Sequence, residues 1–178
     1  MSSDDAPLLD RVEIERALQL LGERLARRGV VADLYVFGGA AMALAYDARR
    51  VTRDIDAVFE PHGVVREEAE TVARELGLPA WWLNEQASVY VARSGDPEAP
   101  RVFENAGIRV AAASPAHLLA MKALAARRRD VEDLRVLVRR LGLTVPADVI
   151  AVCAEIFPEE HLPDRARLLL DEVFGVGE

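Results

Sequence analysis

Two short apolar segments, joined through a pair of glycines and an alanine-rich stretch, constrain this chain more than any other part of it. Residues 34–37 form an apolar run of the length expected for a buried strand. Gly38 and Gly39 end that run, and paired glycines let the backbone take a positive φ or approach a ligand closely. Residues 40–46 then favour a helix, and residues 54–59 a second strand. The expected centre of the fold is therefore strand, glycine turn, helix, strand.

The second strand begins with two carboxylates separated by one residue. Side chains along a strand alternate between its two faces, so Asp54 and Asp56 are predicted to point the same way. Like charges held side by side repel each other, and a bound cation relieves that repulsion. Mg²⁺ is commonly held by one or two carboxylates together with substrate phosphates. The pair therefore indicates a site for Mg²⁺ or Mn²⁺; the alternative is a strand end with two solvated acids.

The glycine turn and the carboxylate pair, in this order, resemble the signature of nucleotidyltransferases of the DNA polymerase β type. In that superfamily an apolar residue, Gly, and then Gly or Ser precede a helix, and an Asp-x-Asp pair between apolar residues comes after it. The residues that match are Phe37-Gly38-Gly39 and Asp54-Ile55-Asp56. The closer likeness is to the AbiEii branch, which holds nucleotidyltransferase-like toxins and small uncharacterised bacterial relatives.

Further residues carry the likeness to the AbiEii branch and extend it over roughly residues 30–141. Arg and Thr or Ser precede the second strand in that branch, as Arg50, Thr52 and Arg53 do here. A later helix in the branch carries a lysine, followed by an arginine or lysine run and an Asp-x-x-Asp motif. The matching residues are Lys122, Arg127-Arg128-Arg129, Asp130 and Asp133.

The resemblance implies a role for each of these positions. Asp54 and Asp56 would hold Mg²⁺ or Mn²⁺, and Lys122 would neutralise charge that develops on the triphosphate. The positions assigned to nucleotide binding are Gly38, Gly39, Thr52 and Arg53. Asp130 would position Lys122 or take the proton of the acceptor hydroxyl. An equally weighted alternative is that Asp130 caps the N-terminus of the next helix.

Lys122 is also the only lysine among the 22 basic residues of the chain. An ammonium is a compact point charge that can grip a phosphate or lose its proton, whereas a guanidinium is a planar, permanently charged fork. A position that keeps lysine in an arginine-rich chain is therefore expected to need that chemistry. The alternative is a single leftover surface lysine.

Two departures from the wider superfamily bear on whether the chain is an enzyme. The superfamily usually has a third carboxylate on a later strand, and the matching segment here, residues 107–113, contains no acid. The second turn position is Gly39, so no serine hydroxyl is available there to a phosphate. The AbiEii branch tolerates both features. The alternatives are an active transferase, a catalytically degenerate module that binds a nucleotide or partner protein in the manner of an antitoxin, and a purely structural domain.

The activity that the resemblance implies is Mg²⁺-dependent transfer of a nucleoside monophosphate from an NTP to an acceptor. The acceptor would be RNA, tRNA included, or a protein. The chain would then be the toxin of a toxin–antitoxin pair, with a cognate antitoxin as its partner.

Charge and composition exclude some classes of protein. The net charge of −8 argues against binding nucleic acid over the whole surface, although it is compatible with a local basic patch. No run approaches the ~20 apolar residues of a membrane span, and the acidic N-terminal segment lacks the basic region of a signal peptide. We therefore expect a cytoplasmic protein without membrane contact.

Cys153 lies in an apolar helical pattern and is expected to be a buried packing residue.

The remaining patterns predict an α+β fold with a nucleotidyltransferase-like mixed sheet, flanking helices and a C-terminal helical bundle. The further elements expected are helices over residues 8–28 and 65–76, a hairpin over 101–104 and 107–113, and helices that begin near 115, 130, 146 and 163. Residues 1–113 are expected to form the nucleotidyltransferase-like core. Residues 114–178 would form a helical region packed on that core in a single compact unit.

Overall fold

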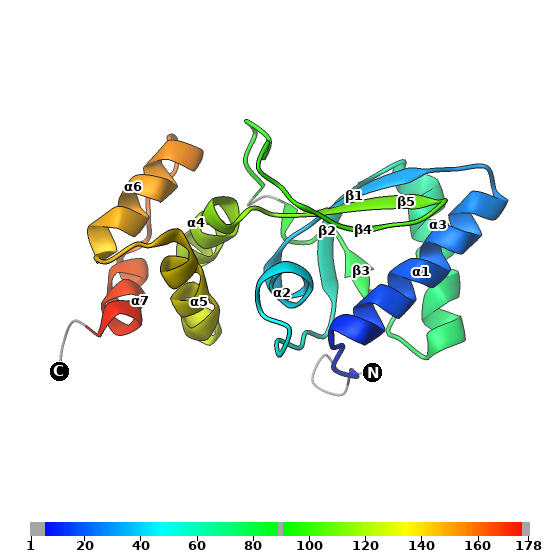
Figure 1. Ribbon diagram of the computed structural model, residues 1–178, viewed down its shortest axis with the longest axis horizontal. Helices are drawn as coiled ribbons and strands as arrows, with labels where there is room; N and C mark the ends of the chain where they lie inside the picture. The colour runs from blue at the N-terminus through cyan, green and yellow to red at the C-terminus, as the bar shows by residue number, and fades with distance from the viewer. Residues whose placement is uncertain (1–5, 89–90, 176–178) are drawn as a thin grey trace. The chain divides into compact units, whose positions relative to one another are not determined.

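The computed structural model describes residues 6–88 and 91–175. The chain forms two compact units. The first comprises Met1–Val89 and Ala99–Ala113, and the second comprises Tyr90–Glu98 and Ser114–Glu178. The first unit is built around a β-sheet, and the second is built from helices (Figure 1).

The sheet of the first unit has five strands in the order β3-β2-β1-β5-β4. Their bounds are Ala32–Val36 for β1, Ile55–Glu60 for β2, Leu83–Asn84 for β3, Arg101–Glu104 for β4 and Ile108–Ala112 for β5. The central strand β1 pairs antiparallel with β2 and parallel with β5. The outer pairs are β2 with β3, which is parallel, and β5 with β4, which is antiparallel. The sheet is therefore mixed, as the sequence predicts.

Alternating burial gives this sheet one covered face and one open face. In β1 the side chains of Ala32, Leu34 and Val36 are buried, whereas Asp33 is exposed and Tyr35 is half-buried. Strands β2 and β5 repeat the alternation. The open face carries a groove of about 610 Å³ across β1, β2 and β5. The covered face is the core of the first unit.

Helices α1, Arg11–Arg27, and α3, His62–Leu76, cover that core (Figure 1). The two helices pack against each other, and they also pack against β5 and β2, respectively. The first turn of α1 is closed by a capping box, in which Asp10 and Glu13 each accept a hydrogen bond from the other's backbone N–H. The Nε1–H of the fully buried Trp82 donates to the Ala69 carbonyl at 2.9 Å, which anchors the segment after α3.

An ion-pair cluster joins α1 to α3. Glu68, only 7% exposed, accepts hydrogen bonds from Arg24 at 2.6 Å and from Arg28 at 3.0 Å. Burial by itself raises the pKa of a carboxyl group, but the two guanidinium hydrogen bonds outweigh it. The pKa of Glu68 is therefore lowered from its ordinary value of 4.5. The same arginines reach two more exposed carboxylates on α3, Glu67 and Glu75.

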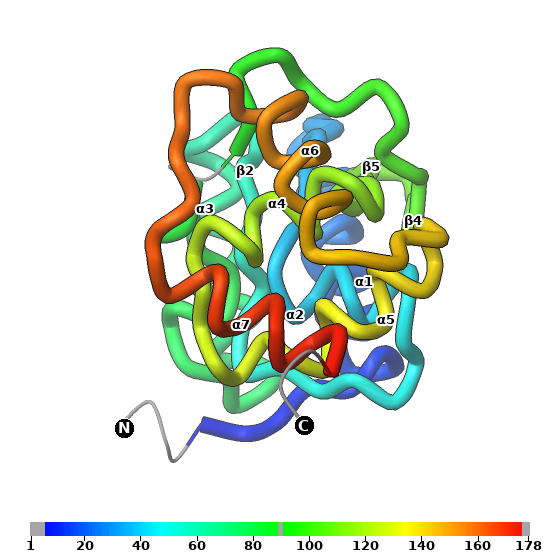
Figure 2. Tube along the Cα trace, turned by 90° about the vertical axis from the view of Figure 1, so that its left-hand side faces the viewer, coloured from blue at the N-terminus to red at the C-terminus, as the bar shows by residue number. Residues whose placement is uncertain are grey.

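Residues 115–174 of the second unit are mainly helical. The bounds of the helices are Pro115–Ala125 for α4, Arg128–Asp130 for the 3₁₀ turn η4, Val131–Leu141 for α5, Pro146–Ile156 for α6 and Asp164–Phe174 for α7. Helix α4 packs against α5, α6 and α7 (Figure 2). Ser114 caps α4 and Pro115 opens its first turn, as predicted. The apolar core of this unit includes Leu118, Leu119, Leu134, Leu137, Val149 and Leu170.

A segment between β3 and β4 belongs to the second unit, although it interrupts the first unit in the sequence. Asp96 Oδ2 accepts a hydrogen bond of 2.7 Å from the backbone N–H of Ser114. Asp96 Oδ1 lies 3.1 Å from His117 Nδ1, and the Gly95 carbonyl lies 3.0 Å from His117 Nε2. Residues 95 and 96 therefore hold the N-terminal turn of α4.

The structure confirms the fold class, corrects the start of two helices and adds one strand. The helix expected from residue 8 begins at Arg11, because Leu9 forms an isolated β-bridge with Thr52. The helix expected from residue 40 begins at Gly38 as α2, Gly38–Ala41, and continues as a π-helix, Met42–Tyr46. Strand β3 was not predicted, because two residues are too few to show an alternating pattern.

Cys153 is buried as expected, and its burial raises the pKa of the thiol to about 11, which leaves it protonated at neutral pH. Within residues 6–88 and 91–175, no helix combines the length and the apolar character needed to cross a bilayer.

Candidate functional site

The glycine turn connects the central strand to a helix and is tied to the carboxylate strand. Phe37 follows β1 in extended conformation, and α2 begins at Gly38. The backbone N–H of Phe37 donates to the Asp56 carbonyl at 3.0 Å, which continues the pairing of β1 with β2. Gly38 has φ +64°, a left-handed conformation that favours glycine over every other residue. The first glycine is therefore required by the shape of the turn.

The same glycine leaves room for a carboxylate. A Cβ added to Gly38 would stand 2.9 Å from Asp56 Oδ2, closer than carbon and oxygen approach without a bond. The Asp56 carboxylate thus lies against the backbone of the turn. The sequence predicted that these residues share a site, and the structure brings these two together within the first unit.

The second glycine has a different neighbour. A Cβ on Gly39 would stand 2.8 Å from Thr52 Oγ1 and 3.8 Å from an Arg50 guanidinium nitrogen. A serine at position 39 would therefore collide with the Thr52 hydroxyl. The structure explains why the turn has no serine here: the space that its side chain would need is occupied by a hydroxyl from the loop before β2.

That loop is held by the N-terminal segment. Thr52 and Leu9 exchange backbone hydrogen bonds of 2.9 and 2.6 Å. Thr52 Oγ1 donates to the Asp54 carbonyl at 3.1 Å, and Arg53 donates to the Ala6 carbonyl at 2.9 Å. Thr52 and Arg53, two of the four positions assigned to nucleotide binding, therefore also fix the loop. The Thr52 hydroxyl faces Gly39 directly.

The two carboxylates lie at the start of β2. Asp54 precedes the strand, Asp56 is its second residue, and both are half-buried on either side of the fully buried Ile55. Asn84 in β3 pairs with Asp56 in the parallel register, and its amide nitrogen donates to Asp54 Oδ2 at 3.1 Å. No role for Asn84 was predicted from the sequence; its only signal was a polar residue directly after an apolar run.

The donor atoms suit a hard divalent cation. Two carboxylates at alternating positions, with a glycine backbone beside one of them, match the way Mg²⁺ is held with phosphate oxygens and water completing its shell. No set of three or more His, Cys, Asp or Glu side chains placed to hold a metal occurs in residues 6–88 and 91–175. A bound ion would therefore depend on oxygens from a nucleotide or water.

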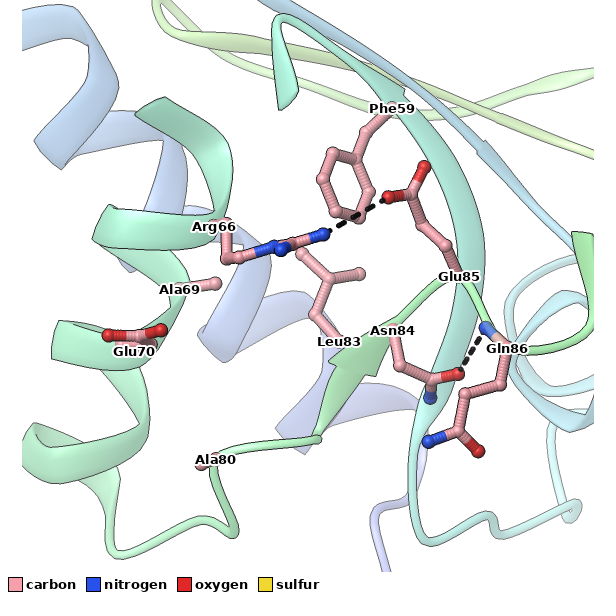
Figure 3. Close-up of a pocket in the computed structure, with 9 residues that line it drawn as sticks. All are labelled: Phe59, Arg66, Ala69, Glu70, Ala80, Leu83, Asn84, Glu85 and Gln86. Atoms are coloured by element: carbon pink, nitrogen blue, oxygen red, sulfur yellow. Dashed lines mark hydrogen bonds and ion pairs between the residues drawn. The ribbon is translucent and has the colours of Figure 1, made fainter. Parts of the chain in front are cut away.

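A pocket of about 390 Å³ adjoins Asn84 at the sheet edge (Figure 3). Apolar side chains from β2, α3 and β3 meet a polar rim there. The residues that line it are Phe59, Arg66, Ala69, Glu70, Ala80, Leu83, Asn84, Glu85 and Gln86. Asn84 thus forms part of the wall of this pocket and also contacts Asp54.

Lys122 and Asp130 belong to the second unit. Lys122 is only 6% exposed, and its ammonium donates to Asp130 Oδ1 at 2.7 Å and to Asp133 Oδ2 at 2.8 Å. Lys122 is therefore not a surface lysine. Asp130 occupies the N-cap position of α5, as the alternative expected, but its side chain makes no capping hydrogen bond to that helix. The contact with Lys122 is the one expected if Asp130 positions the lysine.

The arginine run between α4 and α5 is exposed. Ala126 ends α4 with φ +46°, the only positive φ outside glycine among the described residues. The next three residues, Arg127–Arg129, all extend into solvent, and within residues 6–88 and 91–175 none of them has an ion-pair partner. Most of the ion pairs seen in the described part of the chain join an arginine to a carboxylate, as Arg109 joins Asp33 at 2.7 Å. The run is therefore an unneutralised cationic cluster.

Comparison with known proteins places the chain. The model of a family described as nucleotidyltransferase of unknown function (DUF6036) matches residues 13–151. The match spans the glycine turn, the carboxylate pair, Lys122 and the arginine run. The chain belongs to this family. No curated protein and no solved structure gives a significant match.

Membership of this nucleotidyltransferase family agrees with the site that the first unit presents. It supports a general role in nucleotidyl transfer, with a nucleotide as substrate. The finer likeness to AbiEii toxins, and the roles of individual residues, stay predictions.

Proposed function

We propose that the chain is a Mg²⁺- or Mn²⁺-dependent transferase that moves a nucleoside monophosphate from an NTP to the hydroxyl group of an RNA acceptor. One observation carries this proposal. The Asp56 carboxylate lies against the left-handed turn at Gly38, with 2.9 Å between its Oδ2 and the position of the missing Cβ. A turn of this shape accommodates phosphates, and a carboxylate beside it suits the cation that accompanies them.

The first unit would bind the triphosphate through the turn and the loop that faces it. Backbone N–H groups of Gly38 and Gly39, at the start of α2, are assigned to phosphate oxygens. The Thr52 hydroxyl stands where a side chain at position 39 would reach, so we assign it the contact that a serine makes elsewhere in the superfamily. Arg53 would add positive charge near the loop while it holds the Ala6 carbonyl.

The reaction itself exchanges one bond to phosphorus for another. The acceptor hydroxyl oxygen forms a bond to the α-phosphorus, the bond to the α–β bridging oxygen breaks, and pyrophosphate leaves as the hydroxyl proton is released. Mg²⁺ held by Asp54 and Asp56 would neutralise charge on the phosphate oxygens. The protein contributes mainly by positioning, because phosphoryl transfer needs alignment and charge stabilisation more than covalent help.

Lys122 and Asp130 enter the proposal through the resemblance. Lys122 is assigned to the charge that develops on the triphosphate, and Asp130 to positioning that ammonium. The 2.7 Å contact between them supports the second assignment. Offsetting phosphate charge requires an ammonium held in a fixed place, and the hydrogen bond to Asp130 fixes the Lys122 ammonium.

The arginine cluster Arg127–Arg129 supports RNA over protein as the acceptor. These three guanidinium groups are exposed and have no carboxylate partner among the residues that the structure describes, so they suit a phosphodiester backbone even though the net charge of the chain is −8. The use of such transfer as a toxin, with a cognate antitoxin, rests on the AbiEii likeness alone.

A second candidate function is a binding module that keeps the nucleotide but performs no transfer. The observation that favours it is that no three-carboxylate metal cluster occurs in residues 6–88 and 91–175. Both candidates predict nucleotide binding, so only an assay of chemistry separates them.

The deciding experiment is transfer of label from each α-³²P NTP, with Mg²⁺ or Mn²⁺, to total tRNA or to lysate protein. Asp54→Asn and Asp56→Asn should abolish transfer. Glu60→Gln is the matched control, because Glu60 lies on the same strand and face as Asp56 and is exposed. Label in RNA that depends on both aspartates supports the proposal. NTP binding without transfer under every condition favours the binding module, and label in protein alone overturns the choice of acceptor.

A further inference from the structure

The amide of Asn84 is held in one orientation. Its Oδ1 accepts a hydrogen bond of 3.0 Å from the backbone N–H of Gln86, which Figure 3 marks with a dashed line. Its Nδ2 donates to Asp54 Oδ2 at 3.1 Å and contacts the Trp81 carbonyl at 3.3 Å. Because a backbone N–H can only donate, the amide oxygen must face Gln86 and the NH₂ group must face Asp54.

This orientation matters for Asp54. Asp54 precedes β2, so strand pairing does not fix its side chain in the way that it fixes a residue within the strand. An amide donor on one carboxylate oxygen fixes the plane in which the Asp54 carboxylate lies. Residues in contact with metal ligands commonly act in this way, and their loss lowers metal affinity.

We propose that Asn84 is a positioning residue that sets the affinity of the Asp54–Asp56 pair for a divalent cation. The inference rests on the proposed function, since it presumes that these carboxylates bind a metal. Asn84 reaches the site because β3 pairs in parallel with β2, which puts Asn84 beside Asp56 and within reach of Asp54. The two-residue edge strand thereby serves the site.

The competing explanation is that Asn84 only closes the sheet edge through the Trp81 carbonyl. The two explanations predict different effects of shortening the side chain. A residue that only closes the edge affects unfolding and leaves the folded protein's metal affinity unchanged. A positioning residue changes metal affinity in protein that remains folded. Asn84 lines the open pocket of Figure 3, so Asn84→Ala enlarges an existing pocket and creates no sealed cavity.

The experiment is calorimetric titration of the full-length chain with Mn²⁺ alone, paired with thermal unfolding in the absence and presence of Mn²⁺. The variants are Asn84→Ala, Asn84→Asp and Asp54→Asn. Gln86→Ala is the matched control, because its side chain lines the same pocket and its backbone N–H, which holds Asn84, is retained.

We expect Asn84→Ala to weaken Mn²⁺ binding by about 10-fold or more, and Gln86→Ala to leave it within about two-fold of wild type. Asn84→Asp preserves the shape of the side chain but replaces the donor with a third carboxylate. It should lower the melting temperature without metal and bind Mn²⁺ more tightly than wild type, since the cation relieves the added repulsion.

Each outcome has a distinct meaning. Wild-type affinity in both Asn84 variants, with loss in Asp54→Asn, overturns the role of Asn84 and leaves the metal site standing. Absence of Mn²⁺ binding in wild type instead removes the nucleotide-independent metal site on which the inference rests, and the label-transfer assay then decides the proposed function separately. If Asn84→Ala fails to fold, the near-isosteric Asn84→Asp decides the question by the same titration.

Discussion

Asp56 Oδ2 lies 2.9 Å from the point that a Cβ on Gly38 would occupy. Position 38 requires glycine for two reasons. Its φ of +64° is unfavourable for a residue with a side chain, and the Asp56 carboxylate occupies the space that a Cβ would need. The two effects are separable, because Gly29 has a φ of +70° with no atom within 4 Å of its Cβ position. The chain therefore offers its own control for backbone strain.

Gly38→Ala and Gly29→Ala should each lose about 1 kcal/mol of unfolding free energy from the left-handed backbone. Only Gly38→Ala should also displace the Asp56 carboxylate, and it should weaken Mn²⁺ binding and label transfer by at least about 10-fold. Urea denaturation and Mn²⁺ titration of both variants check this. Equal metal affinity in the two variants would contradict the placement of Asp56 in the metal site.

Lys122→Met should strongly destabilise the second unit. The substitution leaves Asp130 and Asp133 buried without the ammonium that they contact at 2.7 and 2.8 Å, and loss of one partner from a buried ion pair costs about 3–5 kcal/mol. Adding Asp130→Asn and Asp133→Asn should recover much of that loss, because the uncompensated charges are removed. Chemical denaturation measures both effects. A loss below about 1 kcal/mol in the single variant would show that water or a relaxed structure compensates the carboxylates.

Replacement of Arg127, Arg128 and Arg129 by Gln should weaken RNA binding and reduce its salt dependence. Three phosphate contacts contribute a slope of about 2–3 in a plot of log K against log salt concentration. The control is the triple variant of Arg16, Arg27 and Arg93, three exposed arginines elsewhere, which changes net charge equally. Fluorescence anisotropy of labelled tRNA, measured over a range of salt concentrations, gives the slope for each triple variant. Equal slopes for both triple variants would place RNA binding elsewhere.

Glu68→Gln should lower the free energy of unfolding at pH 7 by about 1–2 kcal/mol, because a neutral amide replaces the carboxylate that accepts hydrogen bonds from two guanidinium groups. The pKa of Glu68 is lowered in the folded chain, so its contribution is present above its ordinary value of 4.5 and is lost as pH falls through the lower folded value. The difference from wild type should therefore shrink in acid. Glu67→Gln is the control, because Glu67 is 67% exposed in its pair with Arg28 and should change stability little. A difference that persists after full acidification would argue for lost packing.

The sequence predicted the central unit of the fold well because its signals are local. An apolar run, a glycine pair and alternating carboxylates each specify backbone conformation within a few residues. The start of α4 was found for the same reason, since Ser114 and Pro115 form a cap regardless of what packs around them.

Contacts between distant residues were harder to find. The Asn84–Asp54 hydrogen bond depends on a two-residue strand whose partner lies 30 residues earlier, and no local pattern records that pairing. Thr52 was expected near the nucleotide. That its hydroxyl fills the space a side chain at position 39 would need follows only from the three-dimensional structure. The sequence could not decide whether Asp130 caps the next helix or contacts Lys122, because both roles favour an aspartate at a helix start.

The contact of residues 95 and 96 with α4 has a consequence for the inheritance of this gene. The first turn of α4 is held by Asp96, which is encoded before the last two strands of the sheet. A single recombination event at the β5–α4 junction would exchange the helices but leave behind the carboxylate that holds Ser114 and His117. Such a chimaera would carry a helical unit with an unmatched first turn. The sheet and the helices are therefore expected to be transmitted together, as one coding segment, rather than shuffled as independent modules.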